Sequence, residues 1–184
     1  ASLVRLAKNG GKGAAVISGL YVADNMNFTH AIQIDADGQH DLAAVTDFLD
    51  QAHHNPQALV CGYPLYDQTV PLSRLWGREL TNFWVHVNTR SKALRDAMCG
   101  FRVYPLAQTL PVLPSVKTRR MDFDPDIVVR LIWAGVTVIN RPVRVTYPKD
   151  GISHFRGFSD NMRISRLHAG HFCTMLLRRM GLAK

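Results

Sequence analysis

The feature that most constrains the fold of this chain is a short apolar run, 31–34, that ends abruptly in two aspartates, Asp35 and Asp37. A run this short, closed by an acidic turn, is typical of a strand buried within a sheet. Two carboxylates at the end of such a strand are costly unless a cation or a ligand compensates them. Because the ligands of open α/β sheets bind outside the carboxyl ends of the strands, we expect a functional site here.

Around this run the chain alternates predicted helices with predicted strands. Apolar residues recur at helical spacing over 13–23, 42–52, 73–87 and 161–180. A further helix is predicted over 125–134, with Asp124 as its N-cap and Gly135 just past its end. Strand-like runs cover 58–61, 101–104, 136–139 and 142–147, the last two around a turn. The alternation predicts an α/β fold with a largely parallel sheet.

Composition narrows the classes of partner. Among 184 residues, 22 Lys and Arg against 14 Asp and Glu give a net charge of +8, which favours nucleic acid, an anionic membrane face or phosphorylated substrates. No apolar run approaches the ~18 residues needed to span a bilayer. The three cysteines, Cys61, Cys99 and Cys173, lack metal-ligand spacing, so we predict reduced thiols in a cytoplasmic protein, with Cys61 and Cys99 as small core residues.

The two aspartates suit a divalent cation. Alternation along an extended turn points both side chains the same way, and Gly38 lets the chain bend sharply after them. Carboxylate oxygens bind Mg²⁺ or Mn²⁺, commonly together with substrate phosphates, and the metal then neutralises charge on a diphosphate leaving group. The alternative is that Asp35 and Asp37 only begin a turn and cap the helix from Leu42.

The longer motifs around these residues resemble those of a known family. Four segments carry the resemblance: N-G-G-K-G-A-A at 9–15, I-D-A-D-G-Q-H at 34–40, C-G-F-R-V-Y at 99–104 and M-D-F-D-P-D-I at 121–127. In order and spacing they are similar to the motifs of family 2 glycosyltransferases, and within that family to the dolichyl- and polyprenyl-phosphate sugar transferase group. The resemblance extends from about Asn9 to His154.

The resemblance implies a fold and a domain organisation. It implies a GT-A-like nucleotide-diphospho-sugar transferase fold over 1–158, with a mixed, mostly parallel sheet flanked by helices. A basic amphipathic helix is expected at 159–184. The family's first strand and nucleotide-base pocket are expected to precede Ala1, so that this chain alone lacks the first βα units and binds donor poorly.

The resemblance also implies a reaction. A sugar would pass with inversion from a nucleoside-diphosphate sugar to an acceptor, such as a lipid-linked phosphate or a hydroxyl group. Asp35 is expected to face the nucleotide, and Asp35, Asp37 and Gln39 to hold the metal and diphosphate, with Mg²⁺ or Mn²⁺ as the cofactor.

Further site residues follow from the same resemblance. Arg102 is expected to contact phosphate, which a guanidinium grips with two parallel hydrogen bonds. Arg74 is expected either to face phosphate or to be a solvated helix arginine. Asp126 is expected to act as a general base or to orient the acceptor, although an acceptor phosphate, already an anion, needs no base. The segment 147–156 resembles the family's mobile loop, and with Pro148 in place of the usual arginine, Lys149 is expected to supply a cation to the diphosphate.

Two other functional classes and a choice for the tail stay open. A phosphohydrolase of the haloacid dehalogenase type also begins with an apolar strand and D-x-D, but it usually has Thr where Gln39 stands. A nucleic-acid-binding module would explain the charge, yet the basic residues are dispersed, so no nucleic acid is expected. The helix over 161–180 is expected either to pack on the domain or to rest peripherally on the inner, anionic face of a membrane through its arginines: Arg163, Arg166, Arg178 and Arg179.

Overall fold

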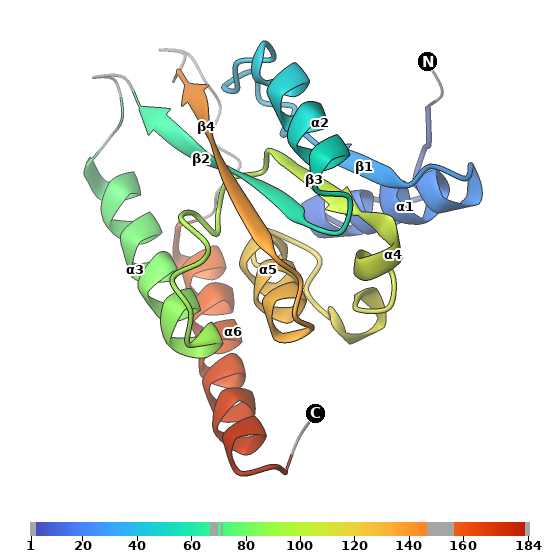
Figure 1. Cartoon of the computed structure of the whole chain (residues 1–184). Helices are drawn as coiled ribbons and strands as arrows, with labels where there is room; N and C mark the ends of the chain where they lie inside the picture. Colours follow the sequence, from blue (N-terminus) through green and yellow to red (C-terminus); the bar gives the residue numbers. More distant parts are fainter. Residues whose placement is uncertain (1–2, 67–69, 71, 147–156, 183–184) are drawn as a thin grey trace.

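A computed structural model describes residues 3–66, 70, 72–146 and 157–182 (Figure 1). The helices and strands follow one another along the chain as α1 (Lys12–Asn25), β1 (His30–Gln33), α2 (Ala44–His54), β2 (Leu59–Tyr66), α3 (Leu72–Thr89), β3 (Arg102–Pro105), α4 (Leu106–Thr109), the 3₁₀ turn η1 (Leu113–Ser115), α5 (Phe123–Trp133), β4 (Val138–Val145) and α6 (Gly157–Arg179). No helix within these ranges is both long and apolar enough to cross a bilayer.

The described strands form one mixed sheet in the order β1-β3-β2-β4. Strands β2 and β4 pair in parallel, whereas β3 is antiparallel to both of its neighbours, β1 and β2. Three strands therefore run in one direction and β3 runs against them, which confirms the α/β class with a mixed sheet flanked by helices; because β3 lies between β1 and β2, only the β2–β4 pair among the described strands is parallel. Because β3 is reversed, its first residue, Arg102, pairs with Gln33, the last residue of β1. The segment before β3 thus reaches the end of β1, where the acidic turn begins.

Each face of the sheet is covered by its own apolar core. Along β2, Leu59 and Cys61 belong to the core under α1, α3 and α5, while Val60 belongs to the core under α2. This alternation is the period of two that a strand imposes on its side chains. The predicted core positions of Cys61 and Cys99 are confirmed, and burial raises the pKa of their thiols to about 12 and about 11.

Two local predictions are wrong. The runs 136–139 and 142–147 are one strand, β4, because Pro142 is tolerated at the edge of the sheet, where a missing N–H breaks no ladder. Helix α5 begins at Phe123, so Asp122 takes the N-cap position and the predicted cap, Asp124, lies in the first turn. Its carboxylate turns toward the sheet, where it joins the candidate site.

Helix α6 packs alongside α3 and α5 (Figure 1). On its inner side, Ile164, His168 and His171 are buried. The ring of Phe172 lies edge-on to Trp84 of α3, with centroids 6.3 Å apart. The tail therefore packs on the domain along one side, and its outer side carries the remaining apolar and basic residues.

Candidate active site at the end of β1

Asp35 leaves the end of β1 and lies against the backbone of Gly100. A Cβ atom added at Gly100 would lie 2.2 Å from each carboxylate oxygen of Asp35. Only glycine leaves room for the carboxylate at this position, and the reversed strand β3 is what brings position 100 beside β1. The C-G-F-R segment and the D-A-D segment, distant in sequence, thus form one wall of the site.

Lys12 links two carboxylates across the site. Its Nζ lies 2.7 Å from Asp35 Oδ1 and 2.6 Å from Asp124 Oδ2, and only about a fifth (20%) of its side chain is exposed. Burial by itself lowers the pKa of Lys12, but the two carboxylates outweigh it and the net shift is upward. The ammonium therefore stays charged, and both aspartates share its single positive charge.

A glycine-rich turn places Lys12 there. Gly11 has φ +90°, and a Cβ atom on it would lie 2.5 Å from the carbonyl oxygen of Arg119. A Cβ atom on Gly13 would lie 2.6 Å from Phe123, the first residue of α5. The start of α1 can dock this closely on the start of α5 only because both positions lack a side chain. This is the structural reason for the N-G-G-K-G segment.

Asp124 is the buried centre of a polar network. Its Oδ1 accepts a hydrogen bond of 3.1 Å from Gln33 Nε2 and lies 3.5 Å from Arg102 Nη1. Burial raises the pKa of Asp124, but Lys12 and Arg102 together hold it below its ordinary value. Tyr104 donates its hydroxyl to Gln33 Oε1 at 2.8 Å, which closes the network behind the acidic turn.

Arg102 does not reach the surface in this structure. Its side chain is 0% exposed, Nη2 donates to the carbonyl oxygen of Ala97 at 2.7 Å, and Nη1 donates to that of Asp124 at 3.0 Å. The expected contact with phosphate has no support in this arrangement, because the guanidinium is enclosed and committed to the backbone. Arg102 instead supports Asp124, and through it Lys12.

The turn after Asp35 is held from both sides. Asp37 Oδ1 accepts the backbone N–H of Gln39 at 3.1 Å, and Gly38 has φ +70°, as the predicted sharp bend requires. The carbonyl oxygen of Gln39 accepts the N–H of Thr146, just after β4, at 3.1 Å. His40 lies edge-on to Phe101, and burial lowers the pKa of its imidazole.

The predicted metal ligands do not by themselves form a complete coordination site. Within the described ranges, no group of three or more His, Cys, Asp or Glu residues could hold a metal ion. Asp35 is paired with Lys12, and the side chain of Gln39 forms no hydrogen bond that the described residues reveal. Asp37, by contrast, is exposed, which fits an ion that a protein holds through one carboxylate and that completes its shell with substrate phosphates and water.

Asp126, the expected base or acceptor-orienting residue, lies in a buried hydrogen-bond network. It is fully buried and accepts hydrogen bonds from Thr118 Oγ1 at 2.8 Å, from His171 Nε2 at 2.9 Å and from Arg130 Nε. Burial raises the pKa of Asp126, but the His171 hydrogen bond and the Arg130 charge lower it overall. A buried, ionised carboxylate with three donors is poorly suited to act as a base, and Asp126 instead ties α6 to α5.

Two predicted site residues cannot be placed. Lys149 lies outside the described residues. The backbone of Arg74 belongs to α3, but its side chain lies outside the described part of the structure. Their roles toward phosphate stay predictions. Conversely, Lys12 was not singled out from the sequence, although the lysine within a glycine-rich helix start was a signal that could have found it.

Comparison with known proteins agrees with this arrangement. No family model matches the chain. The chain is 26% identical over 133 residues to a dolichyl-phosphate beta-glucosyltransferase of Dictyostelium discoideum, an alignment that covers 68% of this chain and 40% of that protein. Its fold is similar to that of glucosyl-3-phosphoglycerate synthase from Mycobacterium tuberculosis, solved in complex with phosphoglyceric acid, with a TM-score of 0.54 at 14% identity.

That structural match covers 100% of this chain and 58% of the synthase chain. The chain thus spans about half the length of the two proteins it matches. The sequence similarity and the shared fold agree with the motifs at 9–15, 34–40 and 99–104. The sequence of this chain is similar to that of a family 2 glycosyltransferase, and the chain shares the GT-A fold of the synthase.

Proposed function

We propose that this chain contributes the diphosphate side of an active site that transfers a sugar, with inversion, from a nucleoside-diphosphate sugar to a phosphate-bearing acceptor. The observation that carries the proposal is the exposed Asp37, two residues after Asp35, which itself belongs to the half-buried Asp35–Lys12–Asp124 cluster at the end of β1. The two similar proteins are named for dolichyl phosphate and for phosphoglycerate. Both names favour sugar transfer over the phosphohydrolase and nucleic-acid-binding alternatives.

Asp37 is the residue that would hold Mg²⁺ or Mn²⁺ together with the donor diphosphate. When bound, such an ion supplies positive charge against the negative charge that develops on the departing diphosphate. Gln39 fixes the turn through its backbone, since its N–H is held by Asp37 Oδ1. The role of the turn is therefore to present one carboxylate in a fixed place.

Asp35 has a separate role because Lys12 and Gly100 fix its position. A carboxylate held this way is a rigid hydrogen-bond acceptor for N–H or O–H groups of the nucleotide. Preorganised polar groups of this kind cost no rearrangement when the substrate binds. Lys12 acts as a positioning residue, since it holds Asp35 and Asp124 in one arrangement.

A phosphate acceptor agrees with the state of Asp126. The oxygen of an acceptor phosphate is already an anion, so it can attack the anomeric carbon directly while the diphosphate leaves from the opposite face. No carboxylate is then needed to remove a proton, and Asp126 is free to serve the α5–α6 contact. A lipid-linked phosphate is the acceptor we favour, because it would bring the basic helix α6 to an anionic membrane face.

Turnover of an Asp37→Ala variant tests the proposal. We expect Mn²⁺-dependent release of nucleoside diphosphate to fall by at least ~100-fold, because a metal contributes several kcal/mol to charge stabilisation. Asp50→Ala, an exposed aspartate on α2, is the matched control and should retain turnover. Equal turnover of the Asp37→Ala variant and the unaltered enzyme would contradict the proposal.

A further inference from the structure

Helix α3 carries an apolar stripe that the fold leaves uncovered. Trp76, Leu80 and Phe83 are 78%, 61% and 56% exposed. Their spacing of four and three residues places them on one side of the helix, roughly opposite Val85, which is buried in the core. A tryptophan this exposed contributes nothing to the packing of the domain, and three large apolar side chains in line mark an interaction surface.

Helix α6 extends this surface. Its outer side exposes further apolar residues: Phe158, Met162, Phe172, Leu176, Leu177 and Met180. Helix α6 packs alongside α3 (Figure 1), with Phe172 against Trp84. The exposed apolar residues of the two helices therefore form one continuous apolar face. We call this face, formed by the outer sides of α3 and α6, the α3–α6 face.

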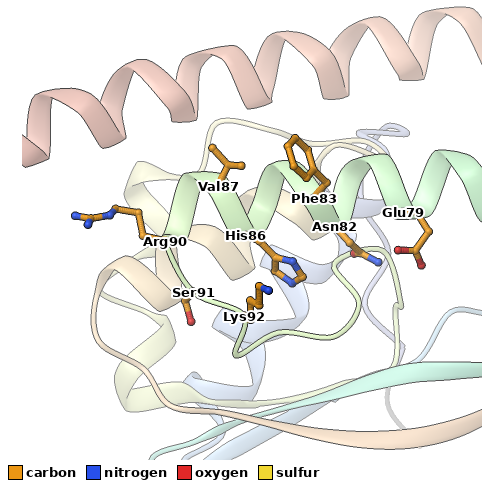
Figure 2. A pocket seen from close by; sticks show the side chains of 8 residues that line it. All are labelled: Glu79, Asn82, Phe83, His86, Val87, Arg90, Ser91 and Lys92. Atoms are coloured by element: carbon orange, nitrogen blue, oxygen red, sulfur yellow. The ribbon is translucent and has the colours of Figure 1, made fainter.

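A groove lies beside the stripe at the C-terminal half of α3. Its volume is about 590 Å³, and its lining combines the apolar Phe83 and Val87 with the cationic Arg90 and Lys92. Figure 2 shows Phe83 and Val87 on one side of the helix, Asn82 and His86 on the other, and Arg90 to Lys92 at its end. Glu79 also lines the groove. Cations beside apolar side chains are the combination that recognises the phosphate and the upper chain of a lipid.

The segments that contain α3 and α6 carry most of the excess positive charge of the chain. Segments 72–92 and 157–182 together carry eight Lys and Arg against two Asp and Glu, whereas the whole chain carries 22 against 14. Some of these cations are paired within the fold, as Arg78 is with Asp96 and Arg163 with Asp160. Arg90, Lys92 and Arg179 are exposed.

We propose that the α3–α6 face docks on an anionic lipid bilayer, with Trp76, Leu80 and Phe83 entering the interface and Arg90 and Lys92 binding lipid phosphate beside them. The charge decides between a bilayer and a second copy of this chain, since two copies joined through this face would bring like charges together. This inference rests on the proposed function and extends it, because it names the membrane that would carry a lipid-linked acceptor. It uses none of the residues of the acidic turn.

Vesicle flotation tests the proposal without any sugar donor. The chain should float with vesicles of mixed phosphatidylcholine and phosphatidylserine, less at high salt, and only weakly with phosphatidylcholine alone. Each cation near an anionic surface contributes about a fivefold gain in binding, so the double variant Arg90→Ala/Lys92→Ala should bind roughly 25-fold more weakly. The variant Trp76→Ser/Leu80→Ser/Phe83→Ser should lose binding by more than tenfold.

Matched controls separate this surface from general effects. Leu49→Ser removes a leucine that is 47% exposed on α2, and Lys117→Ala removes an exposed cation outside the face; neither should change flotation. Circular dichroism would show that each variant folds. Unchanged flotation of the apolar triple variant would overturn the proposal. Equal binding of the unaltered chain to neutral and anionic vesicles would also overturn it. So would self-association of the unaltered chain that the triple variant loses, because the face would then bind a second copy. Flotation that persists in Asp37→Ala distinguishes this surface from the proposed catalytic site.

Discussion

Removal of the Lys12 charge gives the sharpest test of the half-buried Asp35–Lys12–Asp124 cluster. In Lys12→Met the stem of the side chain is kept, but Asp35 and Asp124 lose the ammonium that lies 2.7 and 2.6 Å from their oxygens. Breaking a buried ion pair by removing one partner costs about 3–5 kcal/mol, and water that reaches Asp35 reduces this cost. We therefore expect the free energy of unfolding to fall by about 3 kcal/mol at neutral pH.

The loss should depend on pH in a defined direction. Lys12 and Arg102 hold the pKa of the buried Asp124 below its ordinary value, so this stabilisation is complete above the pKa of an unfolded aspartate, about 3.9, and is lost as the pH falls through the folded pKa. In the variant the pKa of Asp124 rises, and protonation then relieves the unpaired charge. The difference in stability between the variant and the unaltered chain should therefore be largest at neutral pH and shrink in acid.

Urea denaturation at several pH values measures this difference. Lys8→Met, at an exposed lysine in the same N-terminal segment, is the control and should change stability by less than about 0.5 kcal/mol. The double variant Lys12→Met/Asp124→Asn should lose less stability than the two single variants lose together, because either change alone already breaks the ion pair. A loss below about 1 kcal/mol that does not vary with pH would refute the cluster as an electrostatic unit.

Two further predictions concern packing and thiols. Gly100→Ala should destabilise the fold by about 1–3 kcal/mol, because its Cβ would lie 2.2 Å from the oxygens of Asp35. Gly19→Ala in α1 is the control and should stabilise the fold slightly, because no atom lies within 4 Å of the added Cβ. Equal effects of the two variants in urea denaturation would contradict the close contact at Gly100. A thiol reagent at mildly alkaline pH should label only the exposed Cys173 in the folded chain, because burial raises the pKa of Cys61 to about 12 and that of Cys99 to about 11. Rapid labelling of all three cysteines, measured by mass spectrometry, would contradict this prediction.

The sequence predicted the elements better than their contacts. Helical and strand periodicities are local, so most elements appear where the pattern placed them. Strand order is not local, and nothing near Gly100 indicates that a reversed strand would bring it beside Asp35. The burial of a side chain also depends on strand order and packing, which are not local. Arg102 follows a glycine and a phenylalanine in a motif that resembles a phosphate-contacting element, yet it is enclosed within the fold.

The surroundings of Asp124 and Asp126 differ from those predicted for physical reasons. Asp124 precedes a proline at the start of a helical pattern, which is the signature of an N-cap, but helix α5 starts two residues earlier than predicted and turns the carboxylate of Asp124 inward. Asp126 has its partners in Thr118, Arg130 and His171, and the last of these lies in a helix whose packing no local pattern reveals. From the sequence, Asp124 was predicted only as a helix cap and Asp126 as a site residue, and the partners that each carboxylate finds in the fold could not be predicted from either segment.

The proposed function requires the turn after β1 to hold a divalent cation together with a diphosphate. Nuclear magnetic resonance of the chain titrated with Mn²⁺ and a nucleoside diphosphate tests it directly, because Mn²⁺ broadens the signals of nearby residues. We expect the amide signals of 35–40 and of Gly100 to broaden first, and to stay sharp in Asp37→Ala. Broadening that begins elsewhere, or that is unchanged in Asp37→Ala, would contradict the account.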